Sequence, residues 1–267
     1  MKTVKKCITA VFALTVIVLA VVWIGNRDLF RKEPEIVFTE PSETQTYGFS
    51  PLEAFAQQND LALSQWPEEL LQLLEASPEA EEYVLGYPLL KHTIFPIDLS
   101  DQQNTEEVPL LLQWDQRWGY GEYGGSVMGI SGCGPTCLSM VCLYLLDEQM
   151  YDPWYIAQFS MENGYCEPGA GSTWTLISEG GVRLGLDVVE IPLDEKRLIK
   201  NLEVGNPVIC VMGPGDFTTT GHFIVMTGYE NGMIQINDPN SISRSEKDWR
   251  FEDIQDQIRN LWVCRLP

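Results

Sequence analysis

The chain has 267 residues, of which 45% are hydrophobic and 10% aromatic, and this composition indicates a folded protein with a substantial core and excludes a disordered chain. Its formal net charge is −21, and residues 33–267 alone carry 11 basic and 37 acidic side chains. Such an acidic surface repels phosphate backbones and anionic lipid, so no nucleic-acid partner is expected.

The first 32 residues predict a membrane segment. Residues 7–25 are uncharged and mostly apolar, and at about 1.5 Å per residue they would span a hydrocarbon core of roughly 30 Å. We expect an uncleaved signal-anchor that forms a single-pass transmembrane helix, because the residues after Ala20 make a poor cleavage site; secretion after signal cleavage is the alternative. The lysines before the apolar run are expected to stay in the cytoplasm, which would place the rest of the chain outside the cell membrane.

Residues 33–107 are expected to form a linker and a short helical collar. The sequence SPLE at 50–53 has the capping-box pattern of a helix start, and residues 66–88 predict two more short helices, opened by Pro67 and Ser77. These helices carry no cluster of catalytic residue types. We interpret them as a collar packed on the domain that follows; a removable inhibitory pro-segment is the alternative.

Residues 108–267 predict an α+β domain, with helices concentrated in its first half and antiparallel strands in its second. Asn231-Gly232 between two apolar runs is a strong hairpin signal. The expected order is a strand at 108–114, helices at 136–146, from 153, and at 172–185, a strand at 186–191, a helix at 194–203, strands at 208–212, 222–229 and 233–238, a helix at 251–258 and a strand at 261–265.

The stretch GISGCGPTCLSM, residues 129–140, places Cys133 at the start of a helix. Pro135 suits a first helical turn, and the flanking Gly132 and Gly134 let the backbone bend and approach a ligand. Unpaired N–H groups at a helix start stabilise a thiolate, which is the nucleophilic form of cysteine. The alternative is a buried structural thiol, since free cysteine is among the most buried residue types.

A base and an orienting group are available for this thiol on the predicted hairpin. His222 opens the first strand, and Asp238 ends the second, roughly opposite Ile224 and within diagonal reach of the imidazole. A nucleophilic cysteine needs a base within hydrogen-bonding distance and a third group that fixes the tautomer of that base. Cys133, His222 and Asp238 together therefore predict a catalytic triad.

Four separated motifs occur in order, QWDQRWG with YGG and GCGPTCLSM, then GSTWTLISEGGVRLGL, GPGDFTTTGHFIVMTGY and INDPN. With them, residues 108–267 resemble the bacteriocin-leader (double-glycine) peptidase-like branch of the papain-like cysteine peptidases, in its stand-alone exported bacterial form. The resemblance implies a papain-like fold with Cys133 as nucleophile, His222 as general base and acid, and Asp238 as the group that orients His222. It also implies an oxyanion donor upstream of the cysteine, for which Gln113 is the candidate and Gln116 a weaker substitute.

Other residues have less specific roles. Trp174 and Gly221 are expected to line the substrate-binding cleft between the helical and strand halves; an ordinary core tryptophan and turn glycine are the alternatives. No metal or other cofactor is expected, because the chain has no paired, closely spaced cysteine or histidine motif of a zinc site. Disulfide connectivity cannot be read from the sequence.

The predicted function is that of an extracytoplasmic papain-like cysteine peptidase that hydrolyses peptide bonds in a peptide or protein substrate. Two alternatives stay open: an amidase or transpeptidase acting on cell-wall peptide, and a non-catalytic binding domain on a retained fold. The intact set of Cys133, His222 and Asp238 argues against the binding domain, which has no need of all three.

Overall fold

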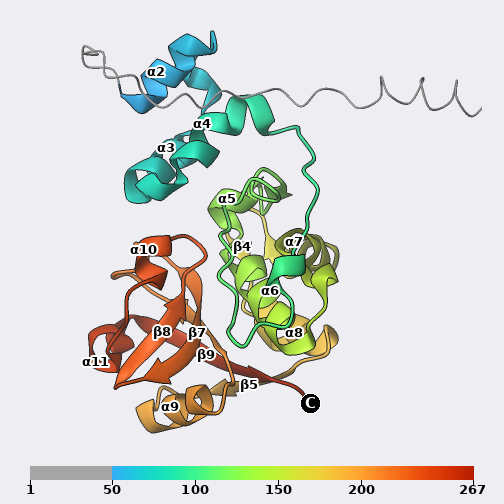
Figure 1. Cartoon of the computed structure of the whole chain (residues 1–267), viewed down its shortest axis with the longest axis vertical. Helices are drawn as coiled ribbons and strands as arrows, with labels where there is room; N and C mark the ends of the chain where they lie inside the picture. Colours follow the sequence, from blue (N-terminus) through green and yellow to red (C-terminus); the bar gives the residue numbers. More distant parts are fainter. Residues whose placement is uncertain (1–49) are drawn as a thin grey trace, which may run out of the picture. The chain divides into compact units, whose positions relative to one another are not determined.

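The computed structural model describes residues 50–267, and these residues form one compact unit (Figure 1). The predicted membrane segment at 1–32 and the start of the linker lie outside the described residues. Within residues 50–267, no helix has both the length and the apolar character needed to cross a membrane.

The predicted collar is a run of short helices. The capping box at its start is present: the Glu53 N–H donates to Ser50 Oγ at 3.3 Å, and the Ser50 N–H donates to Glu53 Oε2 at 2.9 Å. The helices are α2 (Pro51–Gln58), η1 (Leu63–Gln65), α3 (Glu68–Ala76), η2 (Pro78–Ala80) and α4 (Glu81–Leu90).

Tyr83 joins the collar to the rest of the unit. Its ring stacks on Tyr120 with centroids 4.6 Å apart, and its hydroxyl donates to the Gly119 carbonyl at 2.7 Å. The Tyr120 hydroxyl also donates to the Tyr83 carbonyl, at 2.9 Å. Because Tyr83 is 2% exposed, this contact is part of a packed interior.

The helical half follows η3 (Ser100–Gln102), and its main helix begins earlier than predicted. Helix α6 starts at Cys133 and not near residue 136, so the thiol belongs to its first turn. The predicted strand at 108–114 is wrong: residues 108–112 pair with no strand, and the Asn237 side-chain amide donates to the Val108 and Pro109 carbonyls. The elements are β1 (Glu122–Tyr123), β2 (Ser126–Val127), α5 (Met128–Ser131), α6 (Cys133–Leu146), η4 (Gln149–Tyr151) and α7 (Pro153–Glu162).

The predicted helix opened by Ser172 is also different in the structure. Ser172 lies in a two-stranded hairpin, β3 (Cys166–Glu167) with β4 (Gly171–Ser172), and the helix begins four residues later. It consists of a π-helical turn, η5 (Leu176–Gly180), and α8 (Gly181–Arg183). The hairpin is locally favoured, since Gly169 and Gly171 both have positive φ angles.

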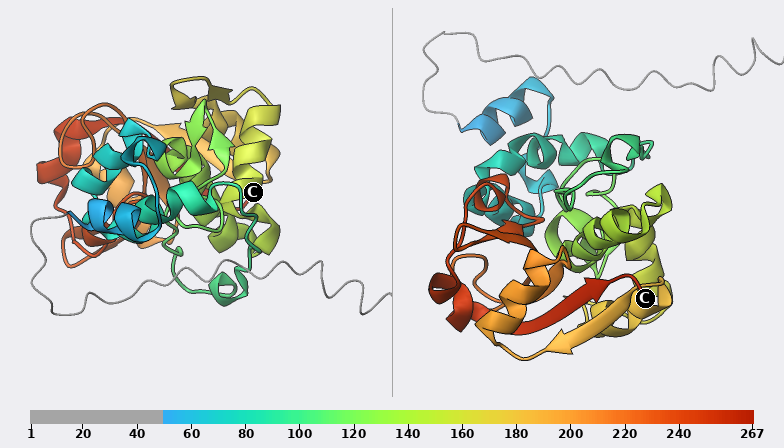
Figure 2. Two further views of the ribbon diagram at one scale, coloured as in Figure 1. Left: turned by 90° about the horizontal axis from the view of Figure 1, so that it is seen from above. Right: turned by 60° about the horizontal axis from the view of Figure 1, so that its bottom comes forward.

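The second half is a five-stranded sheet in the order β5-β9-β6-β7-β8, with every neighbouring pair antiparallel. The predicted α+β class, with a helical half followed by an antiparallel sheet half, is confirmed. Figure 2 shows β9 beside β5 and the helix α9 near them. The elements are β5 (Asp187–Ile191), α9 (Glu195–Glu203), β6 (Val208–Met212), β7 (His222–Glu230), β8 (Met233–Asn237), α10 (Ile242–Ser245), α11 (Phe251–Ile254), η6 (Gln255–Gln257) and β9 (Ile258–Arg265).

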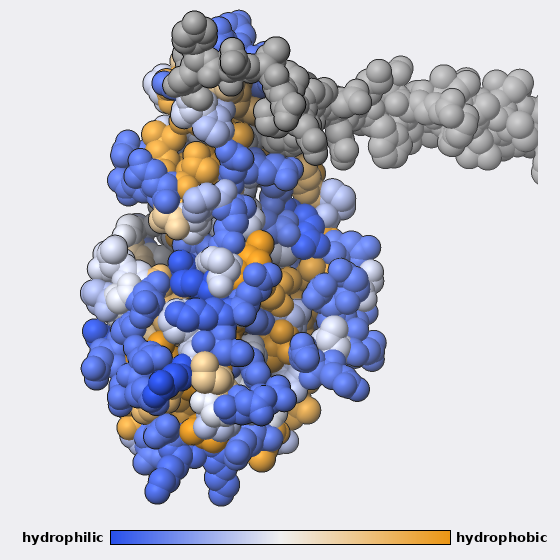
Figure 3. Space-filling view, turned by 60° about the vertical axis from the view of Figure 1, so that its left-hand side comes forward, coloured by the Kyte–Doolittle hydropathy of each residue, from blue (hydrophilic) through white to orange (hydrophobic). Residues whose placement is uncertain are grey.

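The sheet separates two hydrophobic cores. Ile209 and Val211 of β6 face the core built with α6, α7 and η5, whereas Val208, Cys210 and Met212 face the core built with α9 and α11. Because successive side chains of a strand point to opposite faces, all five residues of β6 are buried. On the outside, hydrophilic residues cover most of the face in Figure 3, as the acidic composition requires.

A β-bulge sets the register of the hairpin that carries the candidate base. The turn at Asn231-Gly232 has positive φ at both residues, 54° and 86°, as the sequence predicts. The register shifts between Met226 and Gly228, so that Val225 pairs with Asn237. Asp238 therefore follows at the position across from Ile224, and a regular ladder would instead have placed it across from Val225.

Candidate active site

Cys133 is partly buried at the first position of α6. The first backbone N–H groups of a helix have no intrahelical acceptor, so this position concentrates positive partial charge around the sulfur. Gly134 next to it is required by close packing: a Cβ there would lie 2.4 Å from Ser172 Oγ. The hairpin β3–β4 is thereby pressed against the turn that carries the thiol.

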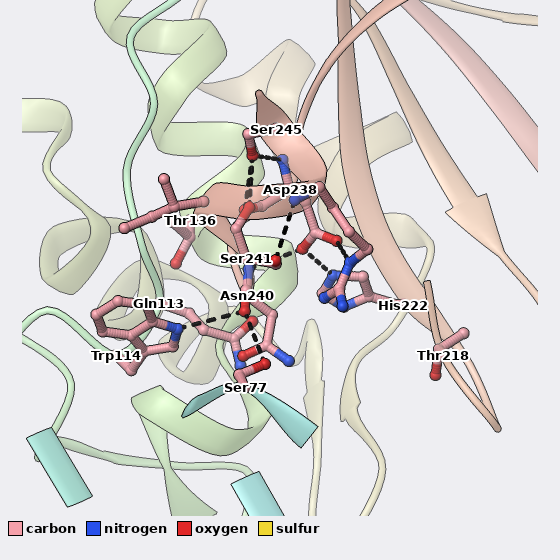
Figure 4. A network of polar contacts seen from close by, with 12 residues as sticks. Ser77, Gln113, Trp114, Thr136, Thr218, His222, Asp238, Asn240, Ser241 and Ser245 are labelled. Carbon is pink, nitrogen blue, oxygen red and sulfur yellow. Dashed lines mark hydrogen bonds and ion pairs between the residues drawn. The ribbon is translucent and has the colours of Figure 1, made fainter. Parts of the chain in front are cut away.

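His222 and Asp238 are in direct contact. His222 begins β7 and Asp238 follows β8, and His222 Nε2 lies 2.7 Å from Asp238 Oδ1 (Figure 4). The two side chains are 8% and 0% exposed. With Nε2 held by the carboxylate, Nδ1 is the imidazole nitrogen left for the thiol.

Two residues that the sequence analysis did not foresee complete the surroundings of Asp238. The Asn240 backbone N–H donates to Oδ1 at 2.8 Å, and Arg244 Nε donates to Oδ2 at 2.6 Å. The sequence indicates Arg244 only as a basic residue six positions after Asp238. The direction of its side chain is set by the one-turn helix α10. Both carboxylate oxygens are thus occupied by donors, which satisfies a fully buried acidic group.

The charged forms of Asp238 and His222 stabilise each other. Burial opposes ionisation of Asp238, but His222 and Arg244 outweigh it and lower the pKa of the carboxyl group below 3.8. Burial also opposes protonation of His222, yet the charge and hydrogen bond of Asp238, together with Cys133, raise its pKa to about 10.

Burial and the neighbouring groups also shift the pKa of the Cys133 thiol in opposite directions. Burial disfavours the thiolate of Cys133, but the hydrogen bond and charge of His222, and the backbone N–H groups of Phe223 and Gly134, lower its pKa below 9. Both shifts favour a Cys133 thiolate beside a His222 imidazolium over the neutral pair.

The remaining thiols of the described residues behave differently. Cys137, one turn further along α6, is buried, and burial raises its pKa well above 9. Burial likewise raises the pKa of Cys264 to about 12. All six cysteines within residues 50–267 are free, and only Cys133 has a lowered pKa among those whose shift is resolved.

Gln113 is buried near the site but its amide is engaged. Nε2 donates to the Gly129 carbonyl at 2.9 Å and to the Ile130 carbonyl at 3.1 Å, which uses both hydrogens of the group. Its Oε1 is buried without a hydrogen-bond partner. In this arrangement Gln113 supports the loop before Cys133, and its role as an oxyanion donor stays a prediction. Gln116 Nε2 points to Glu82 at 3.4 Å.

The two residues expected to bind substrate lie on different segments. Trp174 is 48% exposed and rests edge-on against Trp262, with ring centroids 5.8 Å apart. Gly221 is exposed directly before His222, and its α-carbon has open space around it. Their roles in substrate binding stay predictions.

No group of three or more histidine, cysteine, aspartate or glutamate residues within 50–267 is arranged to hold a metal ion. The network in Figure 4 instead joins Asp238 and His222 to Asn240, Ser77 and Trp114 through hydrogen bonds.

The chain is similar to a known protein family in sequence and to solved structures in fold. Residues 105–263 match the model of the Peptidase_C39 like family. No curated protein matches the sequence. Among solved structures, the peptidase domain of Streptococcus ComA, a bi-functional ABC transporter involved in a quorum sensing pathway, is 20% identical; the match covers 60% of this chain and 99% of that domain, with a TM-score of 0.44. A protein from Bacillus anthracis described as a C39-like peptidase is 17% identical over 61% of this chain and 99% of its own, with a TM-score of 0.42.

Proposed function

Because the chain belongs to the Peptidase_C39-like family, as its motifs suggested, we propose that it is a cysteine peptidase that hydrolyses peptide bonds with Cys133, His222 and Asp238. The observation that carries this proposal is the 2.7 Å contact between His222 Nε2 and the buried Asp238 carboxylate. This contact leaves the opposite nitrogen of a positively charged imidazole for Cys133, the one thiol within residues 50–267 that begins a helix. A structural cysteine has no need of this arrangement.

The proposed reaction begins with the Cys133 thiolate. It attacks the carbonyl carbon of the peptide bond, and the negative charge that develops on oxygen is stabilised by the Cys133 backbone N–H in the first turn of α6. The His222 imidazolium then protonates the leaving amine as the C–N bond breaks, which gives a thioester on Cys133 and a neutral imidazole. The imidazole next takes a proton from water, and the resulting hydroxide equivalent hydrolyses the thioester.

Gln113 is proposed as the second oxyanion donor. To act in this way, one hydrogen of its Nε2 must leave the Gly129 or Ile130 carbonyl when substrate binds. Trp174 is proposed to contact a substrate side chain, since nearly half of its large apolar surface is open to solvent.

The substrate is proposed to be a peptide or protein outside the cytoplasmic membrane. The location is supported by the apolar run at residues 7–25, which follows three lysines. Cell-wall peptide is the second candidate substrate class, because the same thiolate would attack its amide bonds.

The test is alkylation of the protein with iodoacetamide between pH 5 and 10, read by mass spectrometry at Cys133. We expect rapid labelling at neutral pH in the wild type, none at this position in Cys133→Ala, and at least about tenfold slower labelling in His222→Ala. Cys166→Ala is the matched control, because it removes another partly buried thiol and is expected to leave the rate unchanged. Equal, slow labelling of wild type and His222→Ala would overturn the proposal.

A second measurement separates the substrate classes. The protein is incubated with a library of linear peptides and, in parallel, with cell-wall fragments, and products are identified by mass spectrometry. Cleavage confined to the peptide library supports the peptidase, and cleavage confined to the cell-wall fragments assigns the amidase.

A further inference from the structure

Two lines of hydrogen bonds run from the collar to Asp238, one to each carboxylate oxygen. Both start within three residues of each other, at Ser77 and Glu79, at the junction of α3 with η2 and α4. Both end at a buried carboxylate that has no exposed surface.

The first line passes through α10. Glu79 lies across its first turn, with Oε1 accepting the Ile242 N–H at 2.9 Å and Oε2 accepting the Ser243 N–H at 3.2 Å. The next residue is Arg244, whose Nε donates to Asp238 Oδ2 at 2.6 Å. A four-residue helix is not stable by itself, because it forms too few hydrogen bonds to offset the entropy that its backbone loses on ordering. The Glu79 carboxylate therefore adds to the support that α10 receives from its cap Ser241, whose hydroxyl accepts the Arg244 N–H at 3.2 Å.

The second line passes through Asn240. The Ser77 hydroxyl, which is buried, donates to the Asn240 carbonyl at 3.2 Å, and Trp114 Nε1 donates to the same oxygen at 3.4 Å. The N–H of Asn240 donates to Asp238 Oδ1 at 2.8 Å, beside the bond from His222. The carbonyl and the N–H of Asn240 belong to the two peptide groups that flank its α-carbon, so holding the carbonyl restrains the donor to this oxygen.

We infer that Glu79 and Arg244 are positioning residues of the active site, and that the collar is a permanent part of the catalytic machinery. This inference rests on the proposed peptidase function. Arg244 holds the Asp238 carboxylate in the plane that aligns His222, and Glu79 holds the helix turn that aims Arg244. A removable inhibitory pro-segment, the alternative weighed from the sequence, would take these contacts away from the mature site.

The physical reason lies in the burial of Asp238. The charged groups that face it are His222 from β7 and Arg244 from α10, with Cys133 acting through His222. Without Arg244, Oδ2 becomes a buried acceptor with no donor, which favours rotation or protonation of the carboxylate. That rotation would loosen the contact with His222 Nε2 and shrink the population of the thiolate–imidazolium pair.

The experiment measures the rate of iodoacetamide labelling at Cys133 across pH 5 to 10, and kcat and KM on a cleaved peptide, in full-length protein. The variants are Arg244→Gln, Arg244→Lys, Glu79→Ala and the double variant Arg244→Gln/Glu79→Ala. The matched controls are Arg265→Gln, which breaks an exposed ion pair with Asp187, and Glu81→Ala, which removes an exposed carboxylate two residues from Glu79.

We expect Arg244→Gln to slow labelling at pH 7 by about tenfold and to lower kcat with little change in KM, because the loss falls on the ion pair and not on substrate contacts. Arg244→Lys should recover part of the rate, and Glu79→Ala should slow labelling by about threefold. The double variant should be no slower than Arg244→Gln alone, since Glu79 acts through Arg244. Both controls should match the wild type.

The inference is overturned if Glu79→Ala and Arg244→Gln behave like their controls, or if their effects multiply in the double variant. Slow labelling of the wild type itself would instead overturn the proposed peptidase function. Thermal unfolding of each variant checks its fold. If Arg244→Gln does not fold, the labelling rates of Arg244→Lys and Glu79→Ala against their controls decide the question.

Discussion

Both oxygens of the buried Asp238 carboxylate are held by donors. His222 and the Asn240 N–H share Oδ1, and Arg244 takes Oδ2. A carboxylate so bound stays ionised and does not take a proton from the imidazole. Its role in the proposed mechanism is therefore to orient His222 and to stabilise its positive charge.

The opposite pKa shifts of His222 and Asp238 predict how stability changes with pH. The pKa of Asp238 is lowered, so its contribution is present above 3.8 and is lost as the pH falls through the folded value. The pKa of His222 is raised, so its contribution is complete below 6.5 and is lost as the pH rises toward about 10. Together they should stabilise the fold most between these two ordinary values.

Urea unfolding in a Cys133→Ala background, which removes titration of that thiol, tests this prediction. The free energy of unfolding should decline between pH 6.5 and 9, and the decline should be smaller in the same background carrying His222→Gln. Parallel curves for the two proteins would contradict a raised pKa of His222.

Two possible roles of Gln113, oxyanion donor and structural support, can be distinguished by experiment. If it turns toward an oxyanion during catalysis, Gln113→Ala should lower kcat by about 100-fold with a small change in KM, as expected for one lost oxyanion donor. If it only supports the carbonyls of Gly129 and Ile130, the variant should lose stability while each folded molecule keeps its activity. Kinetics with active-site titration, together with thermal unfolding, separate the two.

Among the elements, those with local signals could be predicted from the sequence and those set by tertiary contacts could not. The Ser50 capping box, the Asn231-Gly232 turn and the Asp152 cap of α7 are local, and the structure has them all. The segment at 108–112 has the apolar pattern of a strand, but two of its carbonyls accept from the Asn237 side chain and the Leu111 N–H donates to Met140 Sδ. Nothing in the sequence nearby indicates these partners.

The residues of the candidate site also divide into those with local sequence signals and those set by tertiary contacts. Cys133 and His222 could be proposed from local glycine, proline and strand patterns, and Asp238 from the hairpin. Glu79 and Arg244 could not, because 163 residues separate Glu79 from its partner Ile242 and a single turn of helix aims Arg244.

Close packing of β4 on the start of α6 gives a prediction for Gly134. A Cβ at this position would lie 2.4 Å from Ser172 Oγ and 2.6 Å from Ser172 Cβ, so either the hairpin or the turn bearing Cys133 must move. Gly134→Ala should cost about 1 to 3 kcal/mol of stability and most of the activity. Urea unfolding and peptide cleavage measure the two effects.

Gly221→Ala is the matched control, because an added Cβ there meets nothing within 4 Å. It should keep wild-type stability, and a raised KM in this variant would support the predicted contact of Gly221 with substrate. Wild-type activity and stability in Gly134→Ala would show that β4 yields without disturbing the thiol.

At the scale of the whole molecule, the collar and the domain that follows it share one interior. The contact of Tyr83 with Tyr120 and the Gly119 carbonyl joins them, and the lines from Ser77 and Glu79 extend that contact to the site. We therefore expect the described residues to unfold in one cooperative transition.

Tyr83 variants test this expectation. Tyr83→Ala should destabilise the protein by about 3 to 5 kcal/mol, as the loss of a buried aromatic ring does. Tyr83→Phe should cost about 1 to 2 kcal/mol, because the Gly119 carbonyl loses its donor. Tyr87→Phe, which removes a more exposed hydroxyl from the same helix, is the control. Two separate transitions in circular dichroism would show that the collar unfolds independently.

The position of β9 has a consequence for when activity can arise during synthesis. This strand, residues 258–265, is made after the others yet lies between β5 and β6 in the sheet. A ribosome-bound chain that has released Cys133, His222 and Asp238 still lacks the strand that joins β5 to the rest. We therefore expect the proposed peptidase activity to arise only after nearly all of the domain has left the ribosome.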